Sequence, residues 1–295
     1  MQCFYASTGY FSKDVNPLSG RRPVVFDKRK SFSGIPLTLP CGKCIGCRMN
    51  WRRQWAVRCM HEKRMHDLSA FVTLTYGDAH LPHLCSLRLE DLQRFMKRLR
   101  KVRPTGLRFF ACGEYGETLR RPHYHVLLFN TDFPDMRYHK DSRGSPLYRS
   151  AELSWLWPYG DHEIAAVTAR SAAYVAGYVM KKAGSEPSHL FGQEPEFRVM
   201  SRRPGLGYSW FMKYAEEAYR HDSAIMDGKE VGLPRYYDTL YERVNGVGSL
   251  KLTKRERRRE MFKFDPADQS QARLLVRERF EILKLARFKR DATDG

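Results

Sequence analysis

The 295-residue sequence predicts an α+β fold, with a mainly antiparallel central sheet flanked by helices and helical extensions. Its segments follow the order strand, helix, two strands, a mixed segment, strand and helix, which is typical of that class. Two strand-like segments, residues 107–111 and 122–129, are near enough in sequence to pair as a hairpin. The second segment is apolar on both faces, which indicates a central strand.

Residues 1–66 form the first predicted domain, a cysteine-rich segment followed by a basic helix. Residues 1–40 are rich in Gly, Pro and Ser, so we expect loops with one or two short strands. Residues 48–66 contain no Gly or Pro, and Trp51 and Trp55 lie four positions apart, on one face of the expected helix.

Residues 67–185 form the predicted core domain. Its first strand covers the β-branched and aromatic residues 71–76, and apolar residues recur at helical spacing over residues 89–102. We expect the hairpin to turn through a long loop that contains Gly113 and Gly116. The other predicted elements are a surface loop over residues 131–150, a strand over residues 163–168, and a helix that Ser171 caps and Gly184 ends.

Residues 186–295 form the third predicted domain, a basic and mostly helical extension. Helices are expected over residues 209–220 and 273–290, and residues 251–259 are a dense basic run. The whole chain has 52 Lys and Arg against 33 Asp and Glu, a net charge of +19. Such an excess favours a polyanionic partner, with nucleic acid ahead of an anionic membrane surface. No apolar run is long enough for a membrane span, and no secretory signal is visible.

The His-x-His segment is the strongest chemical signal. His123 and His125 project from the same face of a strand, because successive strand side chains alternate. Histidines of this kind are often ordinary half-buried residues, but burial in a central strand without partners would be costly. Glu114 is the best third ligand, with Glu117 as its competitor. Two imidazoles and a carboxylate suit Mn²⁺, Zn²⁺ or Mg²⁺.

A tyrosine helix is the second signal. Tyr174 and Tyr178 are one helical turn apart, and Lys181 and Lys182 follow on the same side. A phenol, with a pKa of about 10, needs help to act as a nucleophile, and a lysine ammonium group would favour the phenolate. Gly177 costs roughly 1 kcal/mol inside a helix, and its missing side chain would allow close approach of the metal strand or DNA.

The third signal is a cysteine cluster. Cys41, Cys44 and Cys47 form a Cys-x-x-Cys-x-x-Cys motif, which suits a structural Zn²⁺ site, with an iron–sulfur cluster as the second interpretation. Cys3 or Cys59 would be the fourth ligand. We prefer Cys3, because Cys59 falls inside the predicted basic helix.

Together these segments resemble the three motifs of HUH-type rolling-circle replication initiators, in their usual order. Residues 71–76 resemble the first motif, residues 121–125 the metal motif, and residues 174–181 the tyrosine motif. More narrowly, residues 40–48 and the Trp-containing helix after them are similar to the replication proteins of gokushovirus-like microviruses, which are small single-stranded DNA phages. The resemblance implies an HUH endonuclease fold, which is RRM-like.

The resemblance also implies an activity, that of a metal-dependent nickase and strand transferase or ligase. A tyrosine would cut single-stranded origin DNA, retain a 5′-phosphotyrosine, free a 3′-OH for a host polymerase, and later allow rejoining. His123, His125 and Glu114 would hold Mg²⁺ or Mn²⁺, Tyr174 and Tyr178 would attack, and Lys181 would assist. Related proteins often place Lys where Gly177 stands, which leaves the choice between Lys181 and Lys182 open.

The implied setting is the cytoplasm of a bacterial host. The sequence contains no P-loop motif, so a host helicase would unwind the duplex. Two other hypotheses remain: a non-catalytic zinc-containing nucleic-acid-binding protein, and a metal hydrolase that acts on another phosphoester.

Overall fold

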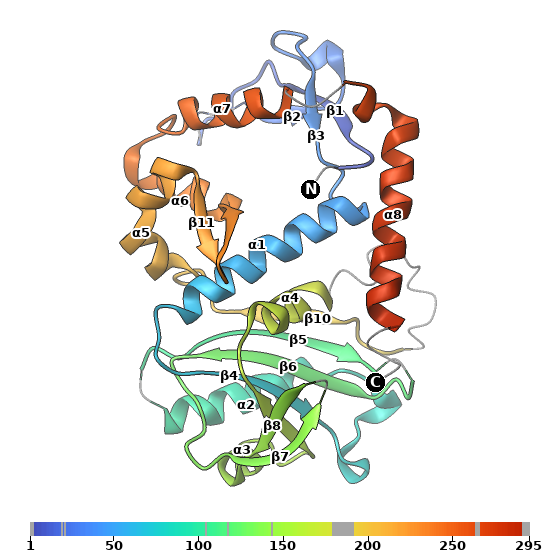
Figure 1. The fold of residues 1–295 in the computed structure, drawn as a ribbon, viewed down its shortest axis with the longest axis vertical. Helices are drawn as coiled ribbons and strands as arrows, with labels where there is room; N and C mark the ends of the chain where they lie inside the picture. The colour runs from blue at the N-terminus through green and yellow to red at the C-terminus, as the bar shows by residue number, and fades with distance from the viewer. Residues whose placement is uncertain are drawn as a thin grey trace. The chain divides into compact units, whose positions relative to one another are not determined.

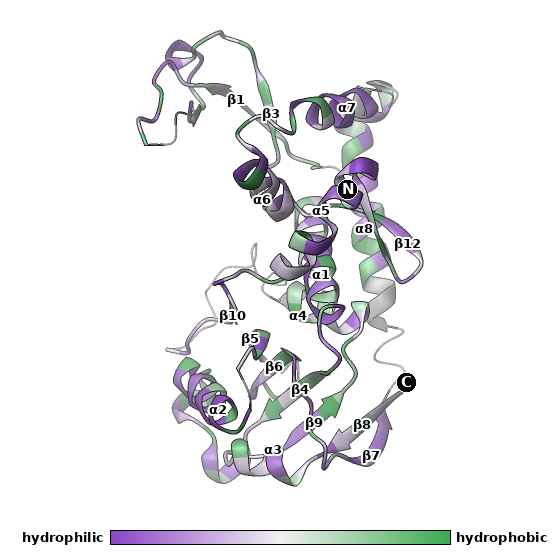
Figure 2. Cartoon of the chain, turned by 90° about the vertical axis from the view of Figure 1, so that its left-hand side faces the viewer, coloured by the Kyte–Doolittle hydropathy of each residue, from purple (hydrophilic) through white to green (hydrophobic). Residues whose placement is uncertain are grey.

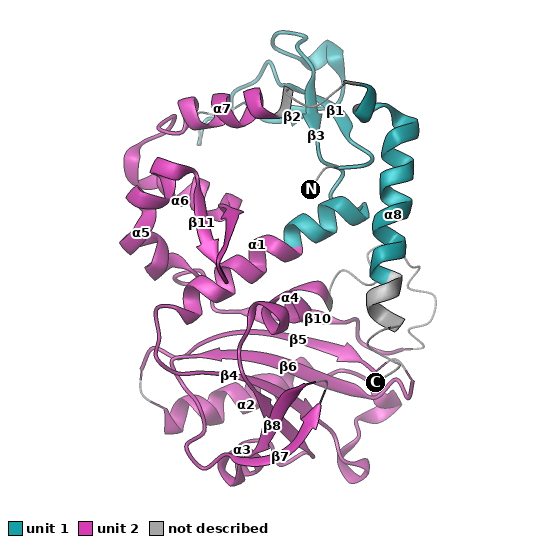
Figure 3. Cartoon of the chain, in the orientation of Figure 1, with its two compact units in different colours: residues 1–51, 261–295 teal, residues 52–260 magenta. Residues whose placement is uncertain are grey.

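The computed structural model describes residues 3–18, 20, 22–103, 105–116, 118–142, 144–178, 192–262 and 266–290. The chain divides into two compact units (Figure 3): a small unit of Met1–Trp51 with Met261–Gly295, and a large unit of Arg52–Glu260. The three-domain division with boundaries near residues 66 and 185 stays a prediction. Among the described residues, none of the helices is both long and apolar enough to span a membrane.

The large unit is built on a seven-stranded antiparallel sheet, in the order β10-β5-β6-β4-β9-β8-β7 (Figure 1). The predicted α+β class and the central place of the histidine strand, β6, are therefore confirmed. The strands are β4 (Ser69–Thr75), β5 (Arg108–Tyr115), β6 (Pro122–Phe129), β7 (Arg137–Ser142), β8 (Ser145–Arg149), β9 (His162–Ala165) and β10 (Phe197–Met200).

Helices cover both faces of this sheet. On one face, α2 (Leu89–Val102) and α3 (Ala151–Leu156) pack against the strands, with Phe95 and Leu99 fully buried beside Val126. On the other face, α4 (Ala169–Tyr178) and the large-unit part of α1 (Ile45–Lys63) bury Val175 and Ala56 against Leu127. The apolar half of this second face anchors α4, and the histidines continue the same face beyond it.

Two sequence predictions about the sheet are wrong. Residues 131–150 are not simply a loop, since they contain the β7–β8 hairpin; β7 is exposed throughout, so it has no alternating apolar pattern to reveal it. Gly113 lies within β5 and not in a turn. A side chain there would lie 3.0 Å from Leu87 and Phe197, so glycine lets β10 and the β5 strand approach.

The rest of the large unit packs around a second core. α5 (Tyr208–His221) and α6 (Arg235–Asn245) bury Trp210, Phe211 and Tyr237, and the ring of His61 stacks on Trp210 at 3.6 Å. The predicted helix over residues 209–220 is thus confirmed. The remaining elements here are β11 (Ser223–Met226), β12 (Lys229–Gly232) and α7 (Lys251–Phe262). Figure 2 shows that α7 is almost entirely hydrophilic.

The small unit contains a three-stranded sheet, in the order β2-β1-β3. Its strands are β1 (Ser7–Phe11), β2 (Val24–Val25) and β3 (Leu37–Leu39), one more than expected. They are too short for their alternation to stand out. The unit also holds α8 (Gln271–Arg290), and α1 begins at Ile45, three residues before the predicted start. The short 3₁₀ helices of the chain are Lys28–Lys30, Asp78–His80, His83–Cys85 and Pro266–Gln269.

Candidate active site

The β5–β6 hairpin brings the predicted metal residues together. Its register places Glu114 directly opposite His123 and Cys112 opposite His125. Directly opposed residues of an antiparallel pair share a face, so Glu114 and both histidines project to the same side. Their potential ligand atoms all lie within 4.8 Å of one another. Glu117, the competing ligand, lies outside the described residues.

One carboxylate oxygen serves both histidines. The Nε2 atom of His123 lies 2.6 Å from Glu114 Oε1, and the Nε2 atom of His125 lies 3.0 Å from the same oxygen. Burial raises the pKa of the Glu114 carboxyl, but these two hydrogen bonds outweigh it and leave the pKa below its ordinary value. Burial likewise opposes charge on His123, but Glu114 wins and raises the pKa of that imidazole.

The donor set fits a divalent cation. Glu114 is only 2% exposed, yet its Oε2 atom is buried without a hydrogen-bond partner. An unsatisfied carboxylate oxygen in a buried site is expensive, and a bound cation would satisfy it. Two imidazole nitrogens and a carboxylate form the mixed ligand set of catalytic centres, and they leave coordination positions for a substrate.

Both imidazoles are held in orientation from behind. His123 Nδ1 lies 3.2 Å from the carbonyl oxygen of Arg121, and His125 Nδ1 lies 3.0 Å from Thr73 Oγ1. A carbonyl oxygen can only accept, so Nδ1 of His123 donates and its Nε2 faces Glu114. Such contacts to the second ring nitrogen fix the tautomer of a metal-binding histidine. Sequence reasoning missed Thr73, whose role depends on the β4–β6 register, in which it pairs with His125.

Tyr174 reaches the histidine cluster from α4. Its ring centroid lies 5.1 Å from that of His125, with the two rings at 82°. The buried residues Val175 and Ala176 anchor the helix, while the Tyr174 side chain is 37% exposed. One tyrosine of the predicted pair is therefore adjacent to the candidate metal site and also accessible to a substrate.

The other residues of the tyrosine motif are only partly described. Tyr178 is the last residue of α4, and its side chain falls outside the described part of the chain. Lys181, Lys182 and Gly184 also lie outside it. The predicted capping of this helix by Ser171 is wrong. The helix begins at Ala169, so its cap is Thr168, whose Oγ1 accepts from the backbone N–H of Ser171 at 3.1 Å.

Gly177 makes room for an arginine of α1. A Cβ atom at this position would lie 3.2 Å from Nε of Arg52. The same Nε donates to the carbonyl oxygen of Ala173 at 2.6 Å, on the preceding turn of α4. The space that the sequence suggested for the metal strand or DNA is thus used by Arg52, a residue that carried no motif of its own.

The predicted cysteine ligands also come together, in the small unit. Cys3, Cys41, Cys44 and Cys47 form one group whose sulfur atoms lie within 4.8 Å of one another. Cys59, the alternative fourth ligand, is instead fully buried in α1 beside Phe110.

Comparisons with known proteins match this architecture to one family. The family model for replication-associated proteins of the ORF2 type matches residues 69–183, which run from β4 to just beyond α4. Replication-associated protein VP4 of Bdellovibrio phage phiMH2K is 36% identical over 236 residues, 75% of this chain and 73% of that protein. Replication-associated protein ORF2 of Spiroplasma virus 4 is 34% identical over 232 residues, 74% of this chain and 72% of that protein.

A more distant relative, replication-associated protein ORF4 of Chlamydia phage 1, is 29% identical over 231 residues, 73% of this chain and 55% of that protein. No solved structure matches the chain significantly. The matched segment contains the histidine strand and Tyr174, and the first two relatives align over most of both chains. The chain therefore belongs to the family of phage replication-associated proteins.

Proposed function

We propose that this protein initiates rolling-circle replication of a small phage by nicking single-stranded origin DNA and later rejoining it. The observation that carries the proposal is the position of Tyr174, whose ring lies 5.1 Å from that of His125 in the Glu114–His123–His125 cluster. A nucleophile beside a divalent-cation site is the arrangement that phosphoryl transfer to a side chain requires.

The chemistry follows from these positions. A divalent cation held by Glu114, His123 and His125, Mg²⁺ or Mn²⁺, would supply charge stabilisation for the scissile phosphate. The phenolic oxygen of Tyr174 forms the new bond to phosphorus, and the bond to the 3′ oxygen breaks. The proton lost by the phenol is balanced by the proton that the 3′ oxygen gains. The products are a 5′-phosphotyrosine and a free 3′-OH.

Rejoining reverses the same exchange. A 3′-OH attacks the phosphotyrosine, which restores the phosphodiester and the free phenol. Tyr178 stands four positions after Tyr174 and would serve as the second nucleophile, so that cutting and joining alternate; Lys181 is the proposed partner of the phenol or the phosphate. Host helicase and host DNA polymerase are the proposed partners, acting in the bacterial cytoplasm.

The charge distribution supports a DNA partner. Exposed basic side chains line α2 and α7, for example Lys97, Arg100, Arg255 and Arg258. Arg198 of β10 lies in register with Cys112, two strands away from His125 on the same face of the sheet. Contacts from such residues to phosphates would make the affinity fall as the salt concentration rises.

A covalent-adduct assay tests the proposal. The protein is mixed with Mn²⁺ and labelled single-stranded oligonucleotides that tile its parent genome, then separated on a denaturing gel. We expect a shifted band that requires the metal, persists in Tyr174→Phe and in Tyr178→Phe, and disappears in the double variant. Tyr138→Phe is the matched control, because this exposed tyrosine of β7 bonds only to the nearby Asp141 among the contacts described.

The alternatives give different gels. DNA binding without any adduct across the genome would favour a non-catalytic nucleic-acid-binding protein. Metal-dependent cleavage that leaves no adduct would point to a hydrolase.

A further inference from the structure

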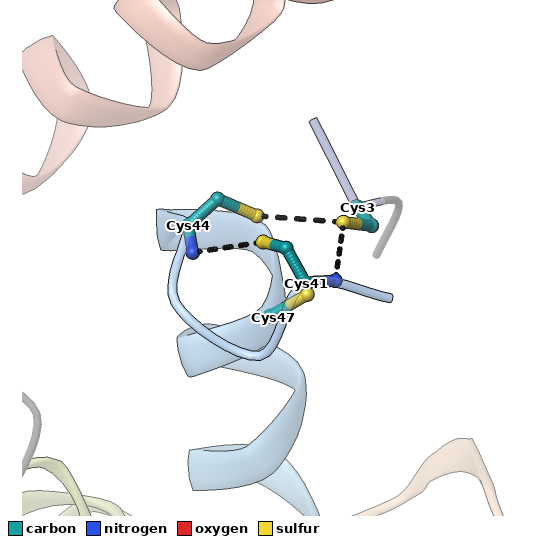
Figure 4. Close-up of side chains that lie close together, drawn as sticks. All are labelled: Cys3, Cys41, Cys44 and Cys47. Carbon is teal, nitrogen blue, oxygen red and sulfur yellow. Dashed lines mark hydrogen bonds between the residues drawn. The ribbon is translucent and has the colours of Figure 1, made fainter. Parts of the chain in front are cut away.

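Four cysteines of the small unit form a compact group of sulfur atoms. Cys3, Cys41, Cys44 and Cys47 converge at the start of α1 (Figure 4), and the sulfur atoms of Cys3 and Cys44 are 3.9 Å apart. A disulfide would bring two sulfurs to about 2.05 Å, and all four cysteines are free thiols. The function proposed above makes no use of this group.

The local fold explains why Cys3 joins the motif. β1 pairs with β3 in antiparallel register, with Ser7 opposite Leu39. Cys3 lies four residues before Ser7 and Cys41 two residues after Leu39, so this pairing brings both to the same end of the sheet. Cys44 stands just before α1 and Cys47 in its first turn.

Backbone amides already point at these sulfurs. The N–H of Cys41 donates to Cys3 Sγ at 3.2 Å, that of Cys44 to Cys41 Sγ at 3.3 Å, and that of Phe4 to Cys44 Sγ at 3.4 Å. Hydrogen bonds from amides stabilise negative charge on sulfur and orient metal ligands. The first turn of α1 has no acidic residue, so thiolates at Cys44 and Cys47 would provide the negative charge that a helix N-terminus favours.

We propose that these four thiolates bind a single Zn²⁺ ion in a closed, structural site. A tetrahedron with Zn–S bonds of about 2.3 Å has sulfur–sulfur edges of about 3.8 Å. The distance between Cys3 and Cys44 matches that edge, and the whole group stays within 4.8 Å. In a [4Fe–4S] cluster each thiolate binds a different iron atom, which spreads the sulfurs around a larger body than a single ion.

The small unit has a physical need for such an ion. Among its described residues, Phe4 and Cys44 are the buried hydrophobic side chains, while Phe26 and Phe32 are 70% and 62% exposed. Its three strands have five, two and three residues, too few to bury a sizeable core. Small folds with so little core are commonly held by a metal or by disulfides. The zinc would therefore fix the segment before β1 to the first turn of α1.

Metal analysis of the full-length protein tests the site. The protein is purified without chelator from cells grown with both zinc and iron, and its metal content is measured by mass spectrometry. His123→Ala/His125→Ala serves as the reference background, so that metal at the active site is not counted. In that background we expect one zinc per chain, its loss in Cys41→Ser/Cys47→Ser, and its retention in Cys85→Ser, a half-buried thiol outside the group.

A cobalt titration keeps the test decisive if the cysteine variant does not fold. The reference protein is stripped of metal and titrated with Co²⁺, and we expect the visible spectrum of tetrahedral cobalt bound by thiolates. Absence of that spectrum would overturn the proposal. So would zinc that persists in Cys41→Ser/Cys47→Ser, iron with acid-labile sulfide, or a metal-free protein with disulfide-linked cysteines. None of these results depends on whether the protein nicks DNA.

Discussion

The two candidate metal sites differ in what they leave open. The Glu114–His123–His125 cluster offers three mixed ligands on one sheet face, and Tyr174 stands beside it with part of its side chain exposed. The four-cysteine group offers four identical ligands that enclose a single point. Three ligands leave room for a phosphate to bind the metal, whereas four thiolates complete a tetrahedron.

The supporting contacts differ in the same sense. Side chains and a carbonyl oxygen hold the rings of the first site, which sets the direction of each nitrogen. Backbone amides surround the sulfurs of the second, which stabilises their charge. The comparison teaches that one chain separates reactivity from scaffolding by ligand number and ligand type.

Removing both histidines should have the largest effect. In His123→Ala/His125→Ala we expect adduct formation to fall by more than about 100-fold, because losing direct ligands costs more than losing the groups that orient them. Zinc should remain bound at the cysteines. The initial rate of adduct formation and the metal content are measured together, and full activity in this variant would remove the metal from the proposed mechanism.

Thr73→Val should have an intermediate effect. Valine keeps the shape but cannot hydrogen-bond to His125 Nδ1, so we expect the Mn²⁺ affinity to fall about 10–100-fold. Thr75→Val is the matched control, since the hydroxyl of Thr75 donates to the Asp161 carbonyl oxygen. Isothermal titration compares the two variants, and equal losses in both would mean that Thr73 does not orient the ligand.

Acid should weaken the open site by roughly tenfold per pH unit. Glu114 raises the pKa of His123 above its ordinary 6.5, and a protonated imidazole cannot bind a metal. Binding therefore displaces a proton below this raised pKa, so affinity climbs with pH and levels off above it. Mn²⁺ titrations between pH 5 and pH 9 measure the midpoint. Glu114→Gln should move that midpoint to lower pH, and an unmoved midpoint would contradict the pairing.

Cys112→Ala should have the smallest effect. This buried thiol lies opposite His125 in the hairpin but belongs to the apolar cluster around Phe110, not to the ligand group. We expect a loss of about 1 kcal/mol of stability from the smaller side chain. The Mn²⁺ affinity should stay within about twofold. Urea unfolding and metal titration separate the two quantities, and a large drop in affinity would make Cys112 a ligand.

The local chemistry of the active site was predictable from sequence. The two-residue period of a strand is enough to place His123 and His125 on one face, and the length of the intervening loop is enough to expect a hairpin. Glu114 follows from that hairpin and was expected as well. Thr73 and Arg52 were not, because their contacts depend on strand register and on helix packing between segments far apart in the chain.

Segments without apolar periodicity also escaped prediction. The β7–β8 hairpin is polar and largely exposed, and the strands of the small unit have at most five residues. Ser171 was expected as a helix cap because it is the right residue type, but Thr168 and Ser171 bond reciprocally, so either could have been named.

By itself, the sequence determined the fold class, the three ligand motifs and the likeness to phage replication proteins, because these rest on residue type and short-range spacing. Only the tertiary structure decided which atoms meet. The β4–β6 and β5–β6 registers choose the groups around each histidine, the β1–β3 pairing selects Cys3 over Cys59, and Arg52 fills the space beside Gly177. Side-chain spacing is a local property of the backbone, whereas these contacts depend on long-range pairing and packing.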